Sequence, residues 1–166
     1  MYKINSFEFY RYEDIIKKED DAGYDKTAFE KILEIKGDSD HTKLIDMLTD
    51  LNDYSIGIED VLKEHFDEEN IVYWMAFQIL MGNVDTQNRN VYLYSPLNSD
   101  IWYFIAWDND GCLMRPEYEL RNFSDQNSWE KGISNYWGNI LFQRCLKSRS
   151  FREKLNDAIL ELRELS

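Results

Sequence analysis

Residues 67–82 read DEENIVYWMAFQILMG, and this stretch decides the fold. Asp67 suits a helix N-cap, and the acidic residues directly after it suit the positive end of the helix dipole. Apolar residues then run on from Ile71, with Gln78 as the one clear polar interruption. A helix that is apolar nearly all round is buried, and Gly82 is typical of a helix C-terminus. The stretch therefore predicts a buried helix at the centre of the domain.

After this helix, the sequence predicts a β-hairpin. A polar stretch at 83–90 is followed by two runs rich in aromatic and β-branched residues, at 91–94 and 101–107. A short segment with Pro, Asn and Ser separates the two runs and suits a turn. The second run ends in the polar sequence Asp-Asn-Asp-Gly at 108–111.

The flanking segments carry weaker signals. An aromatic-rich run at 7–12 favours a strand, and residues 29–35 fit either a strand or a helix. Breaker residues at 37–40 indicate a hinge or a helix start. Apolar residues at helical spacing predict helices at 43–51 and 58–62.

Towards the C-terminus, residues 115–135 are irregular and polar, and a loop of that length in a compact domain is usually functional or mobile. Helical spacing of apolar residues then predicts two closing helices, at 140–146 and 151–162.

Composition narrows the class of protein. The chain has 166 residues, 43% of them hydrophobic and 15% aromatic, which suits one domain with a real core and excludes intrinsic disorder. The formal net charge is −13, which repels phosphate backbones, so we expect no nucleic-acid partner. No apolar run approaches the roughly 18 residues of a membrane span, and the N-terminus shows no signal-peptide pattern. We expect neither feature in this chain.

Residues suited to metal-dependent phosphoryl transfer follow in a fixed order. Asp85 and Asn90 lie in the polar stretch, and Asp108 ends the second predicted strand, which the hairpin would fold back toward them. A phosphotransferase uses one carboxylate to orient or deprotonate the acceptor hydroxyl, and an Asn and a second Asp to hold Mg²⁺ against the phosphates. Spacing alone favours turn capping for Asp85 and Asn90, and a polar turn at 108–111 is well precedented. The ordered combination with the buried helix carries the prediction.

These residues resemble a known family. The segments GNVD at 82–85, NVYLY at 90–94 and WDND at 107–110 stand in the order found in the spore-coat protein H (CotH) kinase family, which is similar to atypical protein kinases. Residues 139–152 also resemble that family, and the likeness covers roughly residues 40–165.

The resemblance implies transfer of the γ-phosphate of ATP to Ser or Thr of a protein substrate, with Mg²⁺ or Mn²⁺. It also implies a location outside the cell or on the spore surface. Residue by residue, Asp85 matches the catalytic-loop Asp, Asn90 the metal-binding Asn and Asp108 the metal-binding Asp. Asp110 matches the second acid of the W-D-x-D pattern and is a further metal candidate.

Neighbouring residues complete the expected site and include departures from the pattern. We expect Asn83, Gln87 and Trp107 in the nucleotide and phosphate neighbourhood. Asn83 and Val84 replace the His-Arg that precedes the catalytic Asp in typical protein kinases, and Gln87 replaces the loop Lys. Asn109 stands where many CotH-like sequences have an apolar residue. These changes leave the acids in place and bear on positioning, and therefore on rate.

The upper lobe of a kinase is not recognisable, because no Gly-rich loop or marked nucleotide Lys precedes the central helix. We interpret residues 37–166 as a kinase-like C-terminal lobe, α+β and mostly helical, with a small antiparallel β-hairpin at the active cleft. Residues 1–36 are interpreted as the tail of the upper lobe. The parent protein would then be a kinase and this chain alone inactive. The alternative is a non-catalytic, pseudokinase-like binding module that uses residues 115–137 on a partner protein or glycan.

Overall fold

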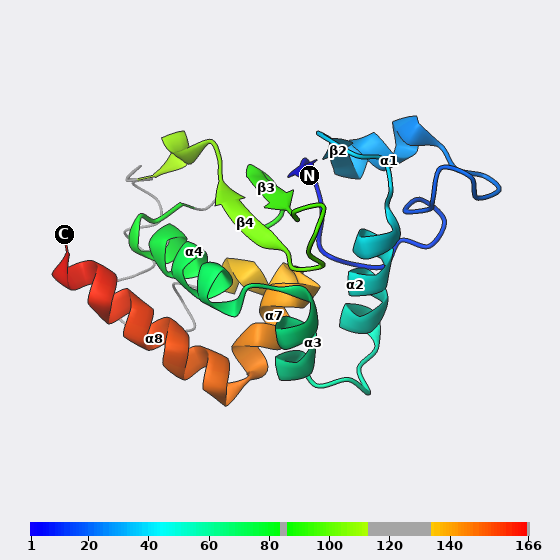
Figure 1. Ribbon diagram of the computed structural model, residues 1–166. Helices are drawn as coiled ribbons and strands as arrows, with labels where there is room; N and C mark the ends of the chain where they lie inside the picture. The colour runs from blue at the N-terminus through cyan, green and yellow to red at the C-terminus, as the bar shows by residue number, and fades with distance from the viewer. Residues whose placement is uncertain (84–85, 113–133, 166) are drawn as a thin grey trace.

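The computed structural model describes residues 1–83, 86–112 and 134–165 (Figure 1). Helices and one small sheet make up the fold, which confirms the predicted α+β class. The elements in chain order are β1 (Tyr2–Ile4), α1 (Lys26–Ile32), β2 (Leu33–Ile35), α2 (Thr42–Asn52), α3 (Ile58–His65), α4 (Glu68–Leu80), β3 (Val91–Tyr94), β4 (Tyr103–Ala106), the 3₁₀ turns η1 (Asn109–Gly111) and η2 (Ser134–Gly138), α7 (Ile140–Lys147) and α8 (Arg149–Glu164). Within these described ranges, no helix has the length and apolar character needed to cross a membrane.

Helix α4 is the predicted central helix. Its N-cap is Asp67, whose side chain accepts a hydrogen bond from the backbone N–H of Asn70, and Gly82 follows its end with a left-handed φ of 62°. Six of its 13 residues are buried, and the helix packs against α8 and β4. Phe77 and Leu80 depart from this pattern, since each is 38% exposed.

The sheet has the strand order β2-β1-β3-β4, with antiparallel pairing throughout. The predicted hairpin is confirmed as β3 and β4, and Tyr94 pairs with Tyr103 next to its turn. Asn70 on α4 covers the edge of β4, because its side chain accepts from the N–H of Phe104 at 2.6 Å and donates to the same residue's carbonyl at 3.1 Å. This bond pair fixes the central helix against the hairpin.

The strand predicted at 7–12 is wrong, and the N-terminal strand lies at Tyr2–Ile4 instead. Phe9 and Tyr12 have φ angles of 62° and 44°, which an extended strand does not allow. Residues 29–35, for which a helix and a strand were both predicted as alternatives, contain one of each. Helix α1 ends at Ile32, and strand β2 begins at the next residue. The breakers at 37–40 precede a helix start, and the predicted helices on either side of α4 are all present.

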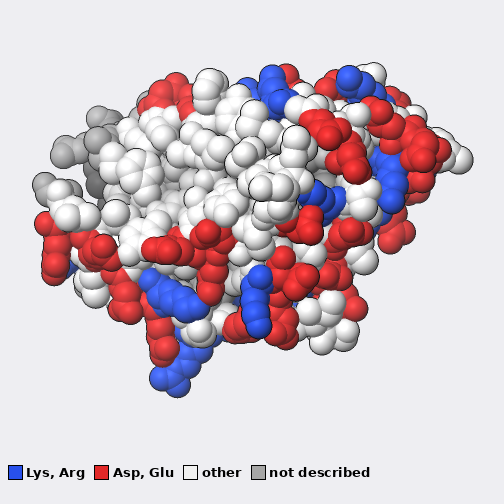
Figure 2. Space-filling view, in the orientation of Figure 1, with Lys and Arg blue, Asp and Glu red and all other residues white. Residues whose placement is uncertain are grey.

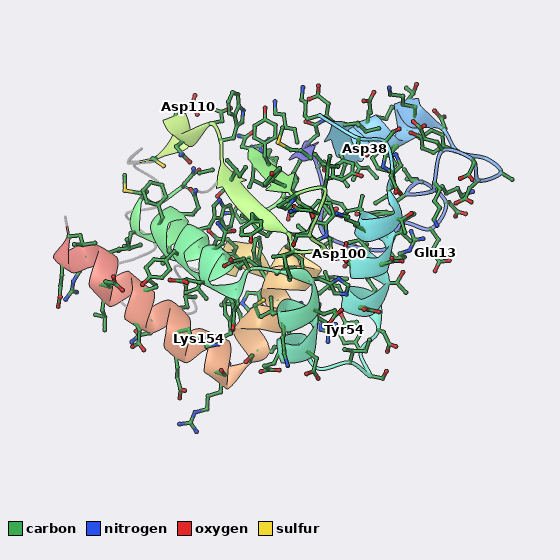
Figure 3. The ribbon with its side chains drawn as sticks, in the orientation of Figure 1. Glu13, Asp38, Tyr54, Asp100, Asp110 and Lys154 are labelled. Atoms are coloured by element: carbon green, nitrogen blue, oxygen red, sulfur yellow. The ribbon has the colours of Figure 1, made fainter. Side chains whose placement is uncertain are left out.

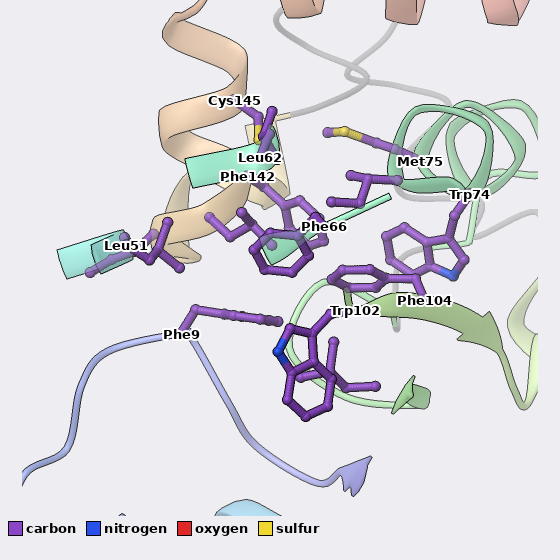
Figure 4. Close-up of a cluster of buried hydrophobic side chains, with 14 of the residues drawn as sticks. Phe9, Leu51, Leu62, Phe66, Trp74, Met75, Trp102, Phe104, Phe142 and Cys145 are labelled. Atoms are coloured by element: carbon purple, nitrogen blue, oxygen red, sulfur yellow. The ribbon is translucent and has the colours of Figure 1, made fainter. Parts of the chain in front are cut away.

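An aromatic cluster joins the N-terminal segment to the helices and the sheet (Figure 4). The ring of Trp74 on α4 stacks on Phe142 of α7 at 5.5 Å and lies 5.0 Å from Phe104 of β4. Phe9, in the N-terminal segment, also stacks on Phe104, with the two ring centroids 6.0 Å apart. Residues 1–36 therefore share one core with the rest of the chain. Their assignment to the tail of an upper lobe stays a prediction.

Carboxylates cover much of the visible surface, with basic side chains interspersed (Figure 2). An uncharged area interrupts them over the hairpin and the C-terminal part of α4. This area adjoins the end of β4, where the candidate metal residues follow.

Candidate functional site

The open end of the β3–β4 hairpin gathers two of the metal candidates. Val91 pairs with Ala106, so Asn90, just before β3, and Asp108, just after β4, flank the same end of the hairpin. Both residues have a left-handed backbone with φ of 57°. Asn and Asp enter this region more readily than other side chains, and residues held there often mark functional sites. The strand register therefore places Asn90 and Asp108 at one end of the hairpin, and their roles stay predictions.

The acidic turn after β4 is exposed. The side chains of Asp108 and Asp110 are exposed, whereas Asn90 is half-buried. In Figure 3, Asp110 lies at the end of the molecule where this turn projects, and Asp100 lies at the opposite end of the hairpin. Asp85, the catalytic candidate, lies outside the described residues. Within the described part of the chain, no group of three His, Cys, Asp or Glu side chains is arranged to hold a metal by itself.

Asn109 ties the acidic turn to the end of α4. Its Oδ1 atom accepts a hydrogen bond from Nδ2 of Asn83 at 3.2 Å and a longer one from Nε2 of Gln78 at 3.4 Å. Both donors are buried. Asn83, expected near the nucleotide, therefore lies beneath the turn and supports it. No role was predicted for Gln78. Its position in an otherwise apolar run was the available signal, because Gln78 is the one polar side chain buried in α4.

The polar loop before β3 is held from two sides. Nδ2 of Asn139, the N-cap of α7, donates to the carbonyl oxygen of Gln87 at 2.9 Å and to Oδ1 of Asn88 at 3.3 Å. The backbone N–H of Phe7 donates to the carbonyl oxygen of Asn88, also at 2.9 Å. Nε2 of Gln87 is 3.4 Å from the carbonyl oxygen of Asn83. Asn139 had no predicted role, although an Asn before an apolar helical run is a capping signal.

Trp107 lies beside the metal candidates on the outer face of the hairpin. It is 47% exposed, and its ring meets that of Tyr92 edge-on at 5.2 Å. Ile105 pairs with Tyr92 in the strand register and is also exposed. The site thus combines exposed carboxylates with an adjoining aromatic surface.

Tyr136 belongs to the core. It is buried, and its ring meets Phe142 edge-on at 5.2 Å. Burial raises the pKa of its hydroxyl, and the neighbouring Thr86 hydroxyl acts in the opposite direction. Most of the segment at 115–137, which the binding-module alternative invokes, lies outside the described residues.

The buried helix, the polar loop, the hairpin and the acidic turn follow one another as in a kinase-like domain. A family model described as CotH kinase protein matches residues 1–165, so the chain belongs to the CotH kinase family. The match confirms the resemblance drawn from the motifs and extends it to the first 39 residues. No curated protein and no solved structure matches the chain.

Proposed function

We propose that this chain carries the metal-binding and acceptor-activating part of an ATP-dependent protein kinase. The reaction is transfer of the γ-phosphate to a Ser or Thr hydroxyl of a protein substrate. The observation that supports it most is the meeting of Asn90 and Asp108 at one end of the hairpin. We propose the cell exterior or the spore surface as its location, on the family resemblance alone.

The donor atoms suit Mg²⁺ or Mn²⁺. Asp108 and Asp110 offer carboxylate oxygens and Asn90 an amide oxygen, which are the hard ligands that these cations prefer. Mg²⁺ commonly takes one or two carboxylates from the protein and completes its shell with water and phosphate oxygens. When bound, the cation would neutralise charge on the transferring phosphates.

The chain's own residues then have separate tasks. Asp85, which the resemblance matches to the catalytic-loop Asp, would orient the acceptor hydroxyl and take up its proton. Asn90, Asp108 and Asp110 would hold the cation. Trp107 offers an exposed aromatic surface beside them on which a base could stack.

Turnover requires parts that the sequence does not reveal. A Gly-rich loop and a nucleotide Lys supply positioning and charge stabilisation, which contribute several kcal/mol to lowering a barrier of this kind. We therefore expect this chain by itself to bind metal and nucleotide without transferring phosphate.

Isothermal calorimetry with ATP and Mn²⁺ tests the proposal. Asp108→Asn removes the charge while keeping a side chain that tolerates the left-handed backbone, and we expect it to abolish detectable binding. Asp100→Asn is the matched control, since Asp100 lies at the other end of the hairpin, exposed and 3.6 Å from Lys43. The control should bind as the wild type does.

Two results would contradict the proposal. If Asp108→Asn binds like the wild type, the metal assignment is wrong. If the wild-type chain binds no metal–nucleotide complex, the non-catalytic binding module becomes the better account of this chain.

A further inference from the structure

Helix α4 carries a buried amide where its neighbours are apolar. Gln78 has 0% exposure, and its Nε2 atom reaches Oδ1 of Asn109 on the acidic turn at 3.4 Å. Its own Oε1 atom is buried without a hydrogen-bond partner. A buried polar atom left unpaired is unfavourable, so a Leu at this position would stabilise the helix better. The amide therefore calls for an explanation other than stability.

A second buried amide converges on the same acceptor. Nδ2 of Asn83 donates to Oδ1 of Asn109 at 3.2 Å, and the backbone N–H of Asn83 bonds to the carbonyl oxygen of Gln78 at 3.0 Å. An amide oxygen has two lone pairs, so one atom of Asn109 takes up both donors. The exposed turn is thereby anchored to two buried amides at the C-terminal end of α4.

The anchored residue lies between the two acids. Asp108 precedes it with a left-handed backbone, and Asp110 follows it in η1. The turn is short, so a shift of Asn109 changes the directions of both neighbouring carboxylates. Metal sites depend on such supporting bonds, and their loss typically lowers metal affinity by about 10–100-fold.

We propose that Asn109 is a positioning residue for the metal site, held by Gln78 and Asn83 so that Asp108 and Asp110 face one cation. The inference rests on the proposed function. By this proposal, the buried amide of Gln78 raises the affinity of the site for the metal and lowers the stability of the fold.

Mn²⁺ titrations of the full chain, followed by electron paramagnetic resonance of the free ion, test this assignment. Asn109→Leu removes the acceptor, and we expect an affinity loss on the order of tenfold. Asn109→Asp keeps an acceptor oxygen at the same place and should bind at least as tightly as the wild type. Asn98→Leu is the matched control, an exposed Asn at the other end of the hairpin, and should have no effect.

Gln78→Leu separates positioning from a purely structural role. We expect this variant to raise the thermal midpoint, because it removes the unpaired buried oxygen, and to weaken Mn²⁺ binding. A structural role alone would not move the two quantities in opposite directions. Asn109 is exposed, so its variants should keep the fold, which circular dichroism verifies.

The outcomes distinguish the two proposals. Wild-type affinity in Asn109→Leu overturns the positioning role, and the proposed function survives if Asp108→Asn has lost the metal in the same experiment. Wild-type affinity in Asp108→Asn, or no Mn²⁺ binding by the wild type, overturns both. A loss in Asn109→Asp equal to that in Asn109→Leu also overturns the positioning role.

Discussion

The side chain of Asn139 bonds to the carbonyl oxygen of Gln87 at 2.9 Å while it caps α7. Its Oδ1 atom accepts from the backbone N–H of Phe142, and its Nδ2 atom serves the polar loop. One fully buried residue therefore links the start of a C-terminal helix to the loop that leads into Asn90. The position of the loop before Asn90 therefore depends on a hydrogen bond from Asn139, which lies 52 residues beyond Gln87 in the chain.

Substitutions at Asn139 separate its two functions. Asn139→Ser keeps a capping oxygen and loses the bond to Gln87, which should lower the free energy of unfolding by about 1–3 kcal/mol. Asn139→Ala loses the cap as well and should cost about 1 kcal/mol more. Urea denaturation gives both values, and hydrogen exchange should rise at residues 86–90 in both variants. Equal stability of the two variants would show that the cap contributes nothing.

The two bonds between Asn70 and Phe104 should matter for stability. Asn70→Ala leaves both backbone groups of Phe104 without this partner on the covered side of β4. We expect a loss of about 1–3 kcal/mol in urea denaturation, with faster hydrogen exchange at residues 103–106. Asn98→Ala, in the exposed hairpin turn, is the control. A change below about 0.5 kcal/mol in Asn70→Ala would contradict the edge-covering role.

Burial of His41 should make stability depend on pH. The hydroxyl of Tyr2 lies 2.8 Å from its Nδ1 atom, and the ring of Phe29 stacks on the imidazole at 4.3 Å. Burial lowers the pKa of His41 below its ordinary value of 6.5, against the opposing effect of nearby carboxylates led by Glu19. The unfolded chain therefore binds more protons below that pH, and the free energy of unfolding should fall from about pH 7 to about pH 5.

His41→Phe tests this origin of the pH dependence. The phenyl ring keeps the stacking and cannot be protonated, so the slope of stability against pH should flatten in that window. Loss of the bond to Tyr2 lowers the whole curve without changing its slope. Urea denaturation at a series of pH values measures both effects. An unchanged slope would assign the pH dependence to other groups.

Nucleotide binding should require the metal. The chain has a net charge of −13 and its two candidate ligands in the acidic turn are exposed, so ATP alone meets repulsion at this end of the hairpin. We expect no detectable ATP binding in EDTA and recovery on adding excess Mn²⁺, both measured by calorimetry. Adenosine carries no phosphate and serves as the control, since metal should not change its affinity. Equal ATP affinity with and without metal would contradict the assigned site.

Strong local signals made much of the fold predictable. The cap at Asp67, the apolar run behind it and Gly82 predicted α4. Two runs rich in aromatic and β-branched residues, on either side of a turn, predicted the hairpin. The order of polar residues around these elements indicated the family, which the match to residues 1–165 confirmed. The roles of Asp85, Asn90, Asp108 and Asp110 stay predictions.

Other features lay beyond the reach of local patterns. The strand Tyr2–Ile4 is only three residues long and pairs with β3 about ninety positions away, so its partner, not its own sequence, determines it. The run at 7–12 has the composition of a strand. In the structure, Phe9 packs against Phe104 in the core and has a left-handed backbone, so this run is not a strand.

The sequence by itself determined the central helix, the hairpin and the order of the candidate residues, because caps, turns and apolar periodicity act between neighbours a few positions apart. Only the tertiary structure decided that Asn83 lies buried under the acidic turn and that Asn139 holds the loop before β3. Hydrogen bonds between distant amides have no local pattern, because the amide groups of Asn and Gln can donate to or accept from many partners. The packing of the apolar core decides which of these partners lie within reach.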